Sequence, residues 1–558
     1  MSRVMLAVGL LVLGRALACA TPEKVCESNE DCFEGTVCQA DGRCREKAGS
    51  TPGGAGSTSA TSSTGSTSSG GTSSSSGALT CQPAAADPTL TTGNPALVRS
   101  AGYGQPTGSS GEWVHALATL SGGDVILGGR YYNGLQLGGC VLEDPNDAYE
   151  LMFLARMTPE GTCVWAHAFL PPAGGTGLQS AVEAVVVDEA DGIYVGARTN
   201  SGGLFAGRAL EDQGAVGLVM KLDATGTPRW RTFVGGDEAS PYTERVMALA
   251  LGGGRLYALA EVRGALTKPV ALLNQPGVDD DVNVALLALD PASGAHQASV
   301  MIAGEPNVFG HALVATGEDR LMVVGSVSGL GNDTEVWVGS STLALGGVAT
   351  SKRVFVTTLD AGLQQVAGAV LWGRESDATV RALATDEGVY LAGTAAQFNA
   401  DICNVPAPAR EEAFVMRVDP PLAVSWVRVA TTTESPSSEF HGSVGTSLHR
   451  DGLGRIWLGA SFFGAFTMGG GELVSNGVDN DVALVALGPS GAHLGSFQMG
   501  GSGDESPRAL TGGVAAAGAE RMWLAGSYDR AVAFLGGDVL TNSDPAYPNI
   551  FLVHVEIP

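Results

Sequence analysis

Short apolar segments alternate with turns rich in glycine and acidic residues from about residue 94 to the end of the chain. Segments of this length with such boundaries are typical of β-strands. One strand-like phrase recurs at a nearly even spacing through this region. Its copies are HALA (His115–Ala118), EAVV (Glu183–Val186), MALA (Met247–Ala250), HALV (His311–Val314), RALA (Arg381–Ala384), TSLH (Thr446–His449) and RALT (Arg508–Thr511).

Further strand-like segments follow each copy, so each repeat unit contains four strands. In the second unit the segments after the phrase are IYVGA, LVMKLD and RWRTFVGG. A unit of four strands in roughly 65 residues is the pattern of a β-propeller blade, although it is longer than the common propeller repeats. Because the phrase occurs seven times, we predict an all-β fold with a seven-bladed β-propeller over residues 94–558.

The two ends of this region predict how the ring closes. The seventh unit ends after its third strand, and the segment ALVRSAGYG (Ala96–Gly104) matches the missing fourth strand. We therefore expect strand 96–104 to complete the last blade, which removes the exposed edge that an open array would leave. The alternative is ordinary β-like sequence without that pairing.

The repeated strands are nearly continuous apolar runs, as expected where both faces of a sheet are covered. The phrases DGIYVGA, FVMRVD and WRTFVGG resemble those of bacterial secreted and cell-surface β-propeller repeat lipoproteins. The resemblance extends over most of the chain and implies an architecture, not an activity.

The N-terminal segment 1–18 has the pattern of an export signal. Arg3 precedes a continuous apolar run, Val4–Leu13, which is too short to span a bilayer. Small residues lead up to Cys19, as in a bacterial lipobox, so we expect a signal peptide over 1–18 and lipid on Cys19 in an anchor region, 19–22. This predicts the outer membrane or cell surface of a Gram-negative bacterium. Plain secretion and an uncleaved anchor are the alternatives.

Two small regions follow the predicted anchor. Residues 23–47 carry Cys26, Cys32, Cys38 and Cys44 at equal spacing. A segment this short needs cross-links to fold, so we expect two disulfides in one of three pairings, with a zinc site as the alternative. Residues 48–80 are rich in Ser, Thr and Gly and predict a flexible, low-complexity linker.

Of the nine cysteines, eight remain for pairing if Cys19 carries lipid. Cys140 and Cys163 lie in the same repeat unit and are a candidate disulfide. Cys81 and Cys403 would then pair with each other or stay free.

The formal net charge of −26 repels nucleic acid and anionic headgroups, so we expect neither as a partner. Acidic residues also recur between units, for example Glu112, Asp504 and Glu505, and these predict a ring of carboxylates at the channel mouth.

Two acidic clusters precede third strands: Asp279, Asp280 and Asp281, and later Asp479 and Asp481. Carboxylates are ligands that calcium prefers, so calcium binding is one interpretation. The spacing lacks the alternation and glycine of a calcium loop, and Asp and Asn also favour turns. We therefore expect turns, and no cofactor except this calcium alternative.

His115, Glu183, His311 and Arg381 occupy the same place in their repeat units. First strands line the channel of a propeller, so these side chains are candidates for a polar inner ring. Their separation on different blades argues against a compact catalytic set. We find no catalytic residues by motif, and structural lining is the simpler interpretation.

These features favour a surface-anchored, non-catalytic and monomeric binding or scaffold protein. Its loop face would bind a glycan, matrix component or protein, and its lipid would bind the outer membrane. The alternatives are a secreted or periplasmic propeller enzyme, such as a glycan lyase or hydrolase, and a passive structural component of the envelope.

Overall fold

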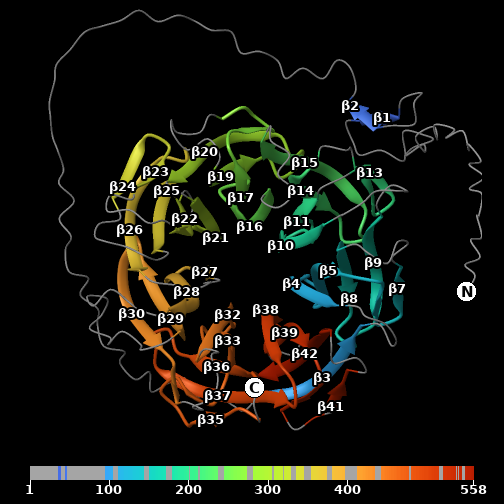
Figure 1. Cartoon of the computed structure of the whole chain (residues 1–558), viewed down its shortest axis with the longest axis vertical. Helices are drawn as coiled ribbons and strands as arrows, with labels where there is room; N and C mark the ends of the chain where they lie inside the picture. Colours follow the sequence, from blue (N-terminus) through green and yellow to red (C-terminus); the bar gives the residue numbers. More distant parts are fainter. Residues whose placement is uncertain are drawn as a thin grey trace, which may run out of the picture.

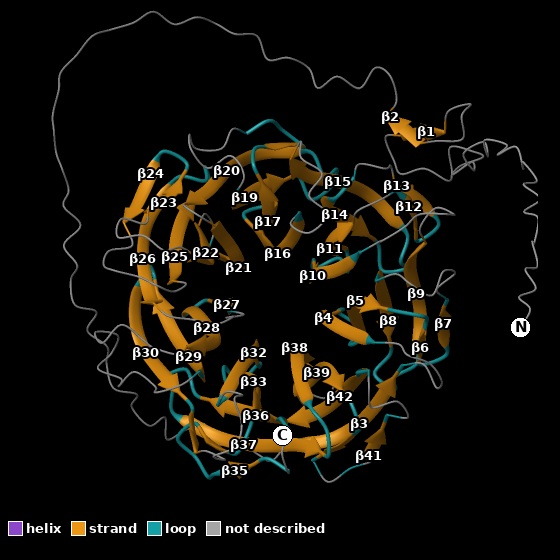
Figure 2. Cartoon of the chain, viewed as in Figure 1, coloured by secondary structure: helices purple, strands orange, loops and turns teal. Residues whose placement is uncertain are grey.

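The computed structural model describes residues 36–38, 44–46 and, with short gaps, 95–557. Every regular element in these residues is a β-strand, and none of them forms a helix long and apolar enough to cross a membrane. The strands form sheets that radiate from a central axis (Figures 1 and 2). The predicted all-β class and β-propeller architecture are confirmed.

Each repeat unit supplies one antiparallel sheet whose first strand is nearest the axis (Figure 1). The first strands are β4 (Glu112–Thr119), β10 (Ala181–Val187), β16 (Arg245–Gly252), β21 (Asn307–Thr316), β27 (Arg381–Thr385), β32 (Ser443–Arg450) and β38 (Glu505–Val514). The second strands are β5 (Val125–Tyr131), β11 (Ile193–Thr199), β17 (Arg255–Arg263), β22 (Arg320–Ser328), β28 (Gly388–Ala395), β33 (Ile456–Phe462) and β39 (Glu520–Tyr528). The third strands are β8 (Leu151–Met157), β14 (Val216–Leu222), β19 (Val282–Leu289), β25 (Arg353–Asp360), β29 (Glu412–Asp419), β36 (Asp481–Leu487) and β42 (Asn549–Ile557). The fourth strands are β9 (Cys163–Leu170), β15 (Pro228–Gly236), β20 (His296–Gly304), β26 (Gln365–Gly373), β30 (Ala423–Val429), β37 (His493–Gly501) and, for the last sheet, β3 (Ala96–Tyr103).

The middle strands of the sheets are buried on both faces. Every residue of β19, β28 and β36 is buried. Their apolar side chains pack against the sheets on either side, which is why these strands are continuous apolar runs instead of alternating ones.

The segments between second and third strands do not project as free loops. Their described parts form short strands that pair with the outer edge of the preceding sheet: β12 on β9, β18 on β15, β23 on β20 and β40 on β37. The short strands in these segments are β6 (Leu135–Leu137), β7 (Cys140–Leu142), β12 (Gly203–Phe205), β13 (Arg208–Leu210), β18 (Leu266–Lys268), β23 (Glu335–Val338), β24 (Ser341–Ala344), β34 (Ala465–Thr467), β35 (Leu473–Val474), β40 (Ala531–Phe534) and β41 (Val539–Thr541). Backbone hydrogen bonds therefore join neighbouring units at the rim and cover fourth strands that would otherwise be open edges.

The predicted number of seven blades differs from the number of sheets: the described residues form eight sheets with three or more strands, one more than the seven units of the repeat. Seven of them have four to six strands, and the eighth is the three-stranded sheet of β31 (Thr431–Thr433), β34 and β35. This sheet is separate because the outer strand of the fifth unit is interrupted at Ala430. β30 stays paired with β29, whereas its continuation β31 pairs with β34.

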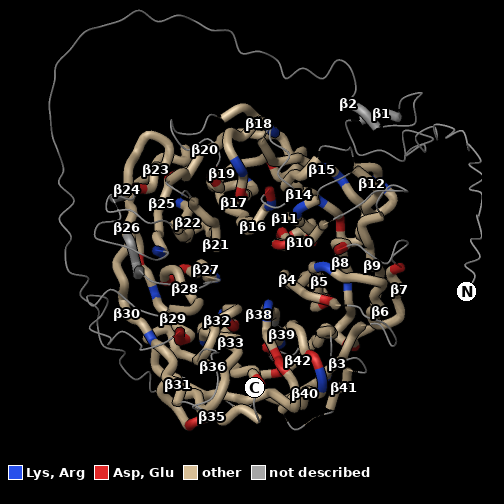
Figure 3. Tube along the Cα trace, viewed as in Figure 1, with Lys and Arg blue, Asp and Glu red and all other residues tan. Residues whose placement is uncertain are grey.

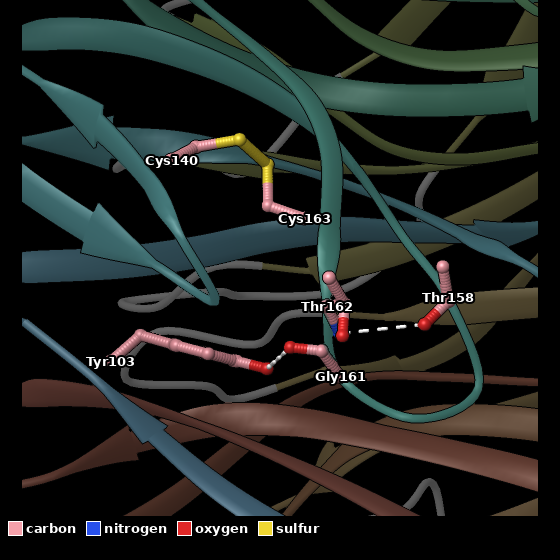
Figure 4. Close-up of a disulfide and its surroundings, with 6 residues drawn as sticks. All are labelled: Tyr103, Cys140, Thr158, Gly161, Thr162 and Cys163. Carbon is pink, nitrogen blue, oxygen red and sulfur yellow. Dashed lines mark hydrogen bonds between the residues drawn. A yellow bond between two sulfur atoms is a disulfide. The ribbon is translucent and has the colours of Figure 1, made fainter.

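The two ends of the repeat region meet in one sheet. β3 pairs with β42, with Ala96 opposite Glu556 at one end and Tyr103 opposite Ile550 at the other. This is the position where the missing fourth strand was expected. Tyr103 also reaches the first unit, because its hydroxyl donates a hydrogen bond of 3.2 Å to the carbonyl of Gly161 (Figure 4). The same turn is closed by the Thr162 N–H, which donates to the Thr158 hydroxyl.

Tryptophans on fourth strands join neighbouring sheets at the equivalent turns of other units. The indole N–H of Trp165, Trp230 and Trp426 donates to the carbonyls of Ala224, Pro291 and Pro489, respectively. Each acceptor lies in the turn after the third strand of the following unit. Tryptophan at this position therefore contributes both buried area and a hydrogen bond between units.

The predicted disulfide between Cys140 and Cys163 is confirmed (Figure 4). It ties β7 to the fourth strand β9 of its own unit. In the N-terminal module, β1 (Thr36–Cys38) and β2 (Cys44–Glu46) form a hairpin in which Cys38 and Cys44 are backbone partners. Cys19, Cys26, Cys32, Cys81 and Cys403, the signal segment and the linker lie outside the described residues.

Candidate functional site

A repeated irregularity places side chains at the centre of the ring. In six of the seven first strands the pairing with the second strand shifts by one residue at the same repeat position, the signature of a β-bulge. The skipped residues are His115, Glu183, Met247, His311, Thr446 and Arg508. In the seventh, Arg381 holds the equivalent position as the first residue of β27.

A cavity of about 230 Å³ opens to solvent between the first strands. Five charged or titratable side chains line it: His115, Glu183, His311, Arg381 and Arg508. All four residues that the repeat suggested for a polar inner ring line this cavity, and Arg508 lines it as well. Figure 3 shows acidic residues on β10 and basic residues on β38 where these strands approach the middle of the ring.

One side of the cavity carries a carboxylate with cationic partners. His115 Nδ1 lies 3.0 Å from Glu183 Oε2, and Arg198 Nε lies 3.4 Å from Glu183 Oε1. Burial by itself raises the pKa of Glu183, but the attraction of His115, Arg245 and Arg198 outweighs it and holds the pKa below its usual range. Glu183 therefore stays ionised at neutral pH.

A second buried carboxylate, that of Glu150, contacts the arginines next to Glu183. Glu150 Oε1 accepts hydrogen bonds from Arg130 and Arg198, and Oε2 accepts one of 2.8 Å from the Tyr132 hydroxyl. Burial and this hydrogen bond raise the pKa of Tyr132 to about 12. Arg198 thus bridges Glu150 and Glu183. Arg130 holds the same position in the first unit, but the repeat alone did not show which carboxylates these arginines contact.

The other side of the cavity carries two arginines. Arg381 Nε donates a hydrogen bond of 3.2 Å to the carbonyl of Thr446. No ion pair joins Arg381 or Arg508 to a carboxylate within the described residues. Burial lowers the pKa of both arginines, and repulsion from Arg508 lowers that of Arg381 further. This side of the cavity is therefore electropositive.

Glu112 and Glu505 do not line the channel mouth, which corrects the expectation for these two loop acids. Both side chains are completely buried, as is Glu244 to within 3%. All three stand three residues ahead of the repeated phrase, where Ser180 and Ser443 in other units accept backbone hydrogen bonds. Burial raises the pKa of Glu244 to about 7 and, with repulsion from Asp481 and other acids, that of Glu505 to about 9.

The candidate calcium ligands have the contacts of a turn where the structure describes them. Asp481 is buried, and its Oδ2 accepts hydrogen bonds from the backbone N–H and side-chain amide of Asn476, both at 3.1 Å. Asp479 lies 3.3 Å from Arg530. Asp281 precedes β19, while Asp279 and Asp280 lie outside the described residues. Within the described part, no three His, Cys, Asp or Glu side chains are grouped as metal ligands would be.

No family model matches this sequence, and no curated protein matches it either. Among similar solved structures is a protein of unknown function from Dyadobacter fermentans, with 10% sequence identity and a TM-score of 0.35. The match covers 83% of this chain and 99% of that one. A likeness of this size carries no conclusion about activity.

Proposed function

We propose that this protein is an exported binding protein of a Gram-negative bacterium, held at the outer membrane or cell surface by lipid on Cys19. Its propeller, a ring of seven blades, recognises an extracellular glycan, matrix component or protein. The N-terminal cysteine module and the linker over 48–80 act as a spacer between the lipid and the ring.

The observation that carries this proposal is the set of polar side chains at the centre of an otherwise apolar ring. The sheets are packed on both faces and joined at the rim, so the framework is rigid and most of its polar groups are used internally. At the axis, however, bulges at His115, Glu183 and Arg508 and the first residue of β27, Arg381, line a cavity that is open to solvent. Convergent polar groups in a concave site on a rigid scaffold are the usual form of a ligand site.

A binding screen tests this role. The full mature chain is applied to an array of bacterial and plant polysaccharides and extracellular proteins, first in calcium and then in EDTA. Retention on a defined glycan or protein supports the proposal. Binding lost in EDTA would assign the acidic loops at Asp279–Asp281 or Asp479–Asp481 a metal-dependent part, and binding indifferent to EDTA would leave them as turns. Mass spectrometry of the mature N-terminus tests the anchor, because an unmodified residue there excludes lipid on Cys19.

The contact between His115 and Glu183 favours one second candidate, a glycan lyase or hydrolase. A carboxylate that holds an imidazole by a hydrogen bond can position it for proton transfer. This alternative predicts that Glu183→Gln abolishes turnover of a polysaccharide that the protein binds, while binding persists. A passive role in the envelope predicts neither binding nor turnover.

A further inference from the structure

The two arginines of the cavity lack the carboxylate partners that other arginines near the axis have. Arg130 and Arg198 contact Glu150, and Arg245 contacts Glu261 at 2.7 Å. Arg508, in contrast, makes no hydrogen bond or ion pair with any described residue, and Arg381 reaches only a backbone carbonyl. Glu183 lines the same cavity and attracts Arg381, but neither arginine forms an ion pair with it. Two like charges that share a cavity without a paired carboxylate favour the binding of an anion there.

Other residues that line the same cavity can accept hydrogen bonds. Glu183 is ionised and uses one oxygen for His115 and the other for Arg198, and each carboxylate oxygen can accept a second bond. His115 also lines the cavity, and its second ring nitrogen is not used by Glu183. A ligand that fits both sides has an anionic group at one end and hydroxyl groups at the other.

The volume of the cavity limits which ligands of this kind can bind. A cavity of about 230 Å³ has the volume of roughly seven or eight water molecules at about 30 Å³ each. That space accommodates one sugar-sized unit. A guanidinium binds a planar carboxylate through two parallel N–H groups, which gives arginine its preference for such a partner.

We infer that Arg381 and Arg508 bind the carboxylate of a small polyhydroxylated acid, a uronic acid unit, inside the central cavity, and that Glu183 and His115 bind its hydroxyl groups. The inference rests on the proposed binding function and specifies its ligand: an acidic glycan whose terminal uronate enters the channel.

The test is calorimetric titration of the full chain with sodium D-glucuronate. D-Glucose serves as the neutral probe of the same shape, and inorganic phosphate and sulfate serve as alternative anions. Arg508→Gln and Arg381→Gln remove one guanidinium each. Arg508→Lys keeps the positive charge but lacks the two parallel N–H groups of a guanidinium. Arg229→Gln is the matched control, because Arg229 lies on the outer strand β15 with a side chain that is 55% exposed. Thermal melting of every variant verifies that it is folded.

We expect glucuronate to bind, glucose not to bind, and the affinity for glucuronate to fall at least tenfold in Arg508→Gln and Arg381→Gln. Arg508→Lys should retain part of the affinity, and Arg229→Gln all of it. Absence of glucuronate binding, equal binding of glucose, or stronger binding of phosphate or sulfate overturns the inference.

The polysaccharide array separates this failure from failure of the proposed function. If Arg508→Gln binds the array as the unchanged protein does, and glucuronate does not bind, the binding function stands and the cavity is not its site. If glucuronate binds with the expected arginine dependence but no macromolecule on the array is retained, the anion site stands and the recognition of extracellular macromolecules is wrong.

Discussion

Glu244 provides a quantitative test of how the ring tolerates buried carboxyl groups. Its side chain is 3% exposed, and Oε1 accepts a hydrogen bond of 2.8 Å from the Gly236 N–H. Burial raises its pKa from 4.5 to about 7, although Gly236 and Lys268 oppose this shift. At about 1.4 kcal/mol for each pKa unit, the difference corresponds to about 3 kcal/mol.

The sign of this effect follows from the proton balance. Below pH 4.5 the carboxyl group is protonated in both states and contributes nothing to pH dependence. Between pH 4.5 and about 7 the unfolded chain loses the proton while the folded protein retains it, so the free energy of unfolding falls as the pH rises. Above about pH 7 the loss is complete. Glu244→Gln keeps an acceptor for Gly236 but cannot ionise, so it should avoid this loss.

The assay is the melting temperature of wild type and Glu244→Gln from pH 4 to 9. For a body of this size, 1 kcal/mol corresponds to about 1 °C, because the entropy of unfolding grows with chain length. We expect the two curves to coincide near pH 4 and to separate by about 3 °C at pH 8, with the variant more stable. Glu189→Gln, at an exposed turn position, is the control and should follow wild type. Parallel curves for Glu244→Gln and wild type at all pH values would refute the reasoning.

Three further predictions concern the cavity, the disulfide and ring closure. The pKa of Glu183 is depressed, so the ion pairs of Glu183 stabilise the fold at pH values above the ordinary pKa of 4.5. This contribution should be lost as the pH falls below 4.5. Melting curves of Glu183→Gln and wild type that do not converge in acid would contradict this. The Cys140–Cys163 disulfide closes a loop with a sequence separation of 23 residues. Its reduction, or a change of both cysteines to alanine, should lower the free energy of unfolding by about 3 kcal/mol, as measured by denaturant titration. An unchanged midpoint of denaturant unfolding would contradict this prediction. Removal of the N-terminal region through Gly104 takes away β3 and exposes the edge of β42. Size-exclusion chromatography should then show aggregates in place of the intact protein's peak. A truncation that ends before residue 95 keeps β3 and should elute normally. A monomeric, equally stable protein without β3 would show that closure does not depend on that strand.

The sequence alone determined the class of fold and the position of each repeated strand. Apolar runs bounded by glycine-rich turns are a local property of the chain, and their regular recurrence revealed the propeller, the meeting of its two ends and the alignment of His115, Glu183, His311 and Arg381. The pairing of Cys140 with Cys163 was accessible for the same reason, since both lie in one unit. Arg508 could have been included from the alignment, because it stands at the same position as Arg381.

Only the tertiary structure decided what these positions do. The six bulges that turn side chains toward the axis depend on pairing between strands, which leaves no mark in a single strand's composition. Glu112 and Glu505 are in turn-like sequence, yet the packing of neighbouring sheets buries them, so their burial could not be deduced from local polarity. The segments between second and third strands form strands where described because the fourth strand of the preceding unit offers unpaired backbone groups within reach. The same holds for the charges of the cavity. Arg198 meets Glu150 and Glu183 because the first two sheets pack against each other, and Arg381 shares a cavity with Arg508 because the ring brings units that are distant in sequence to one axis.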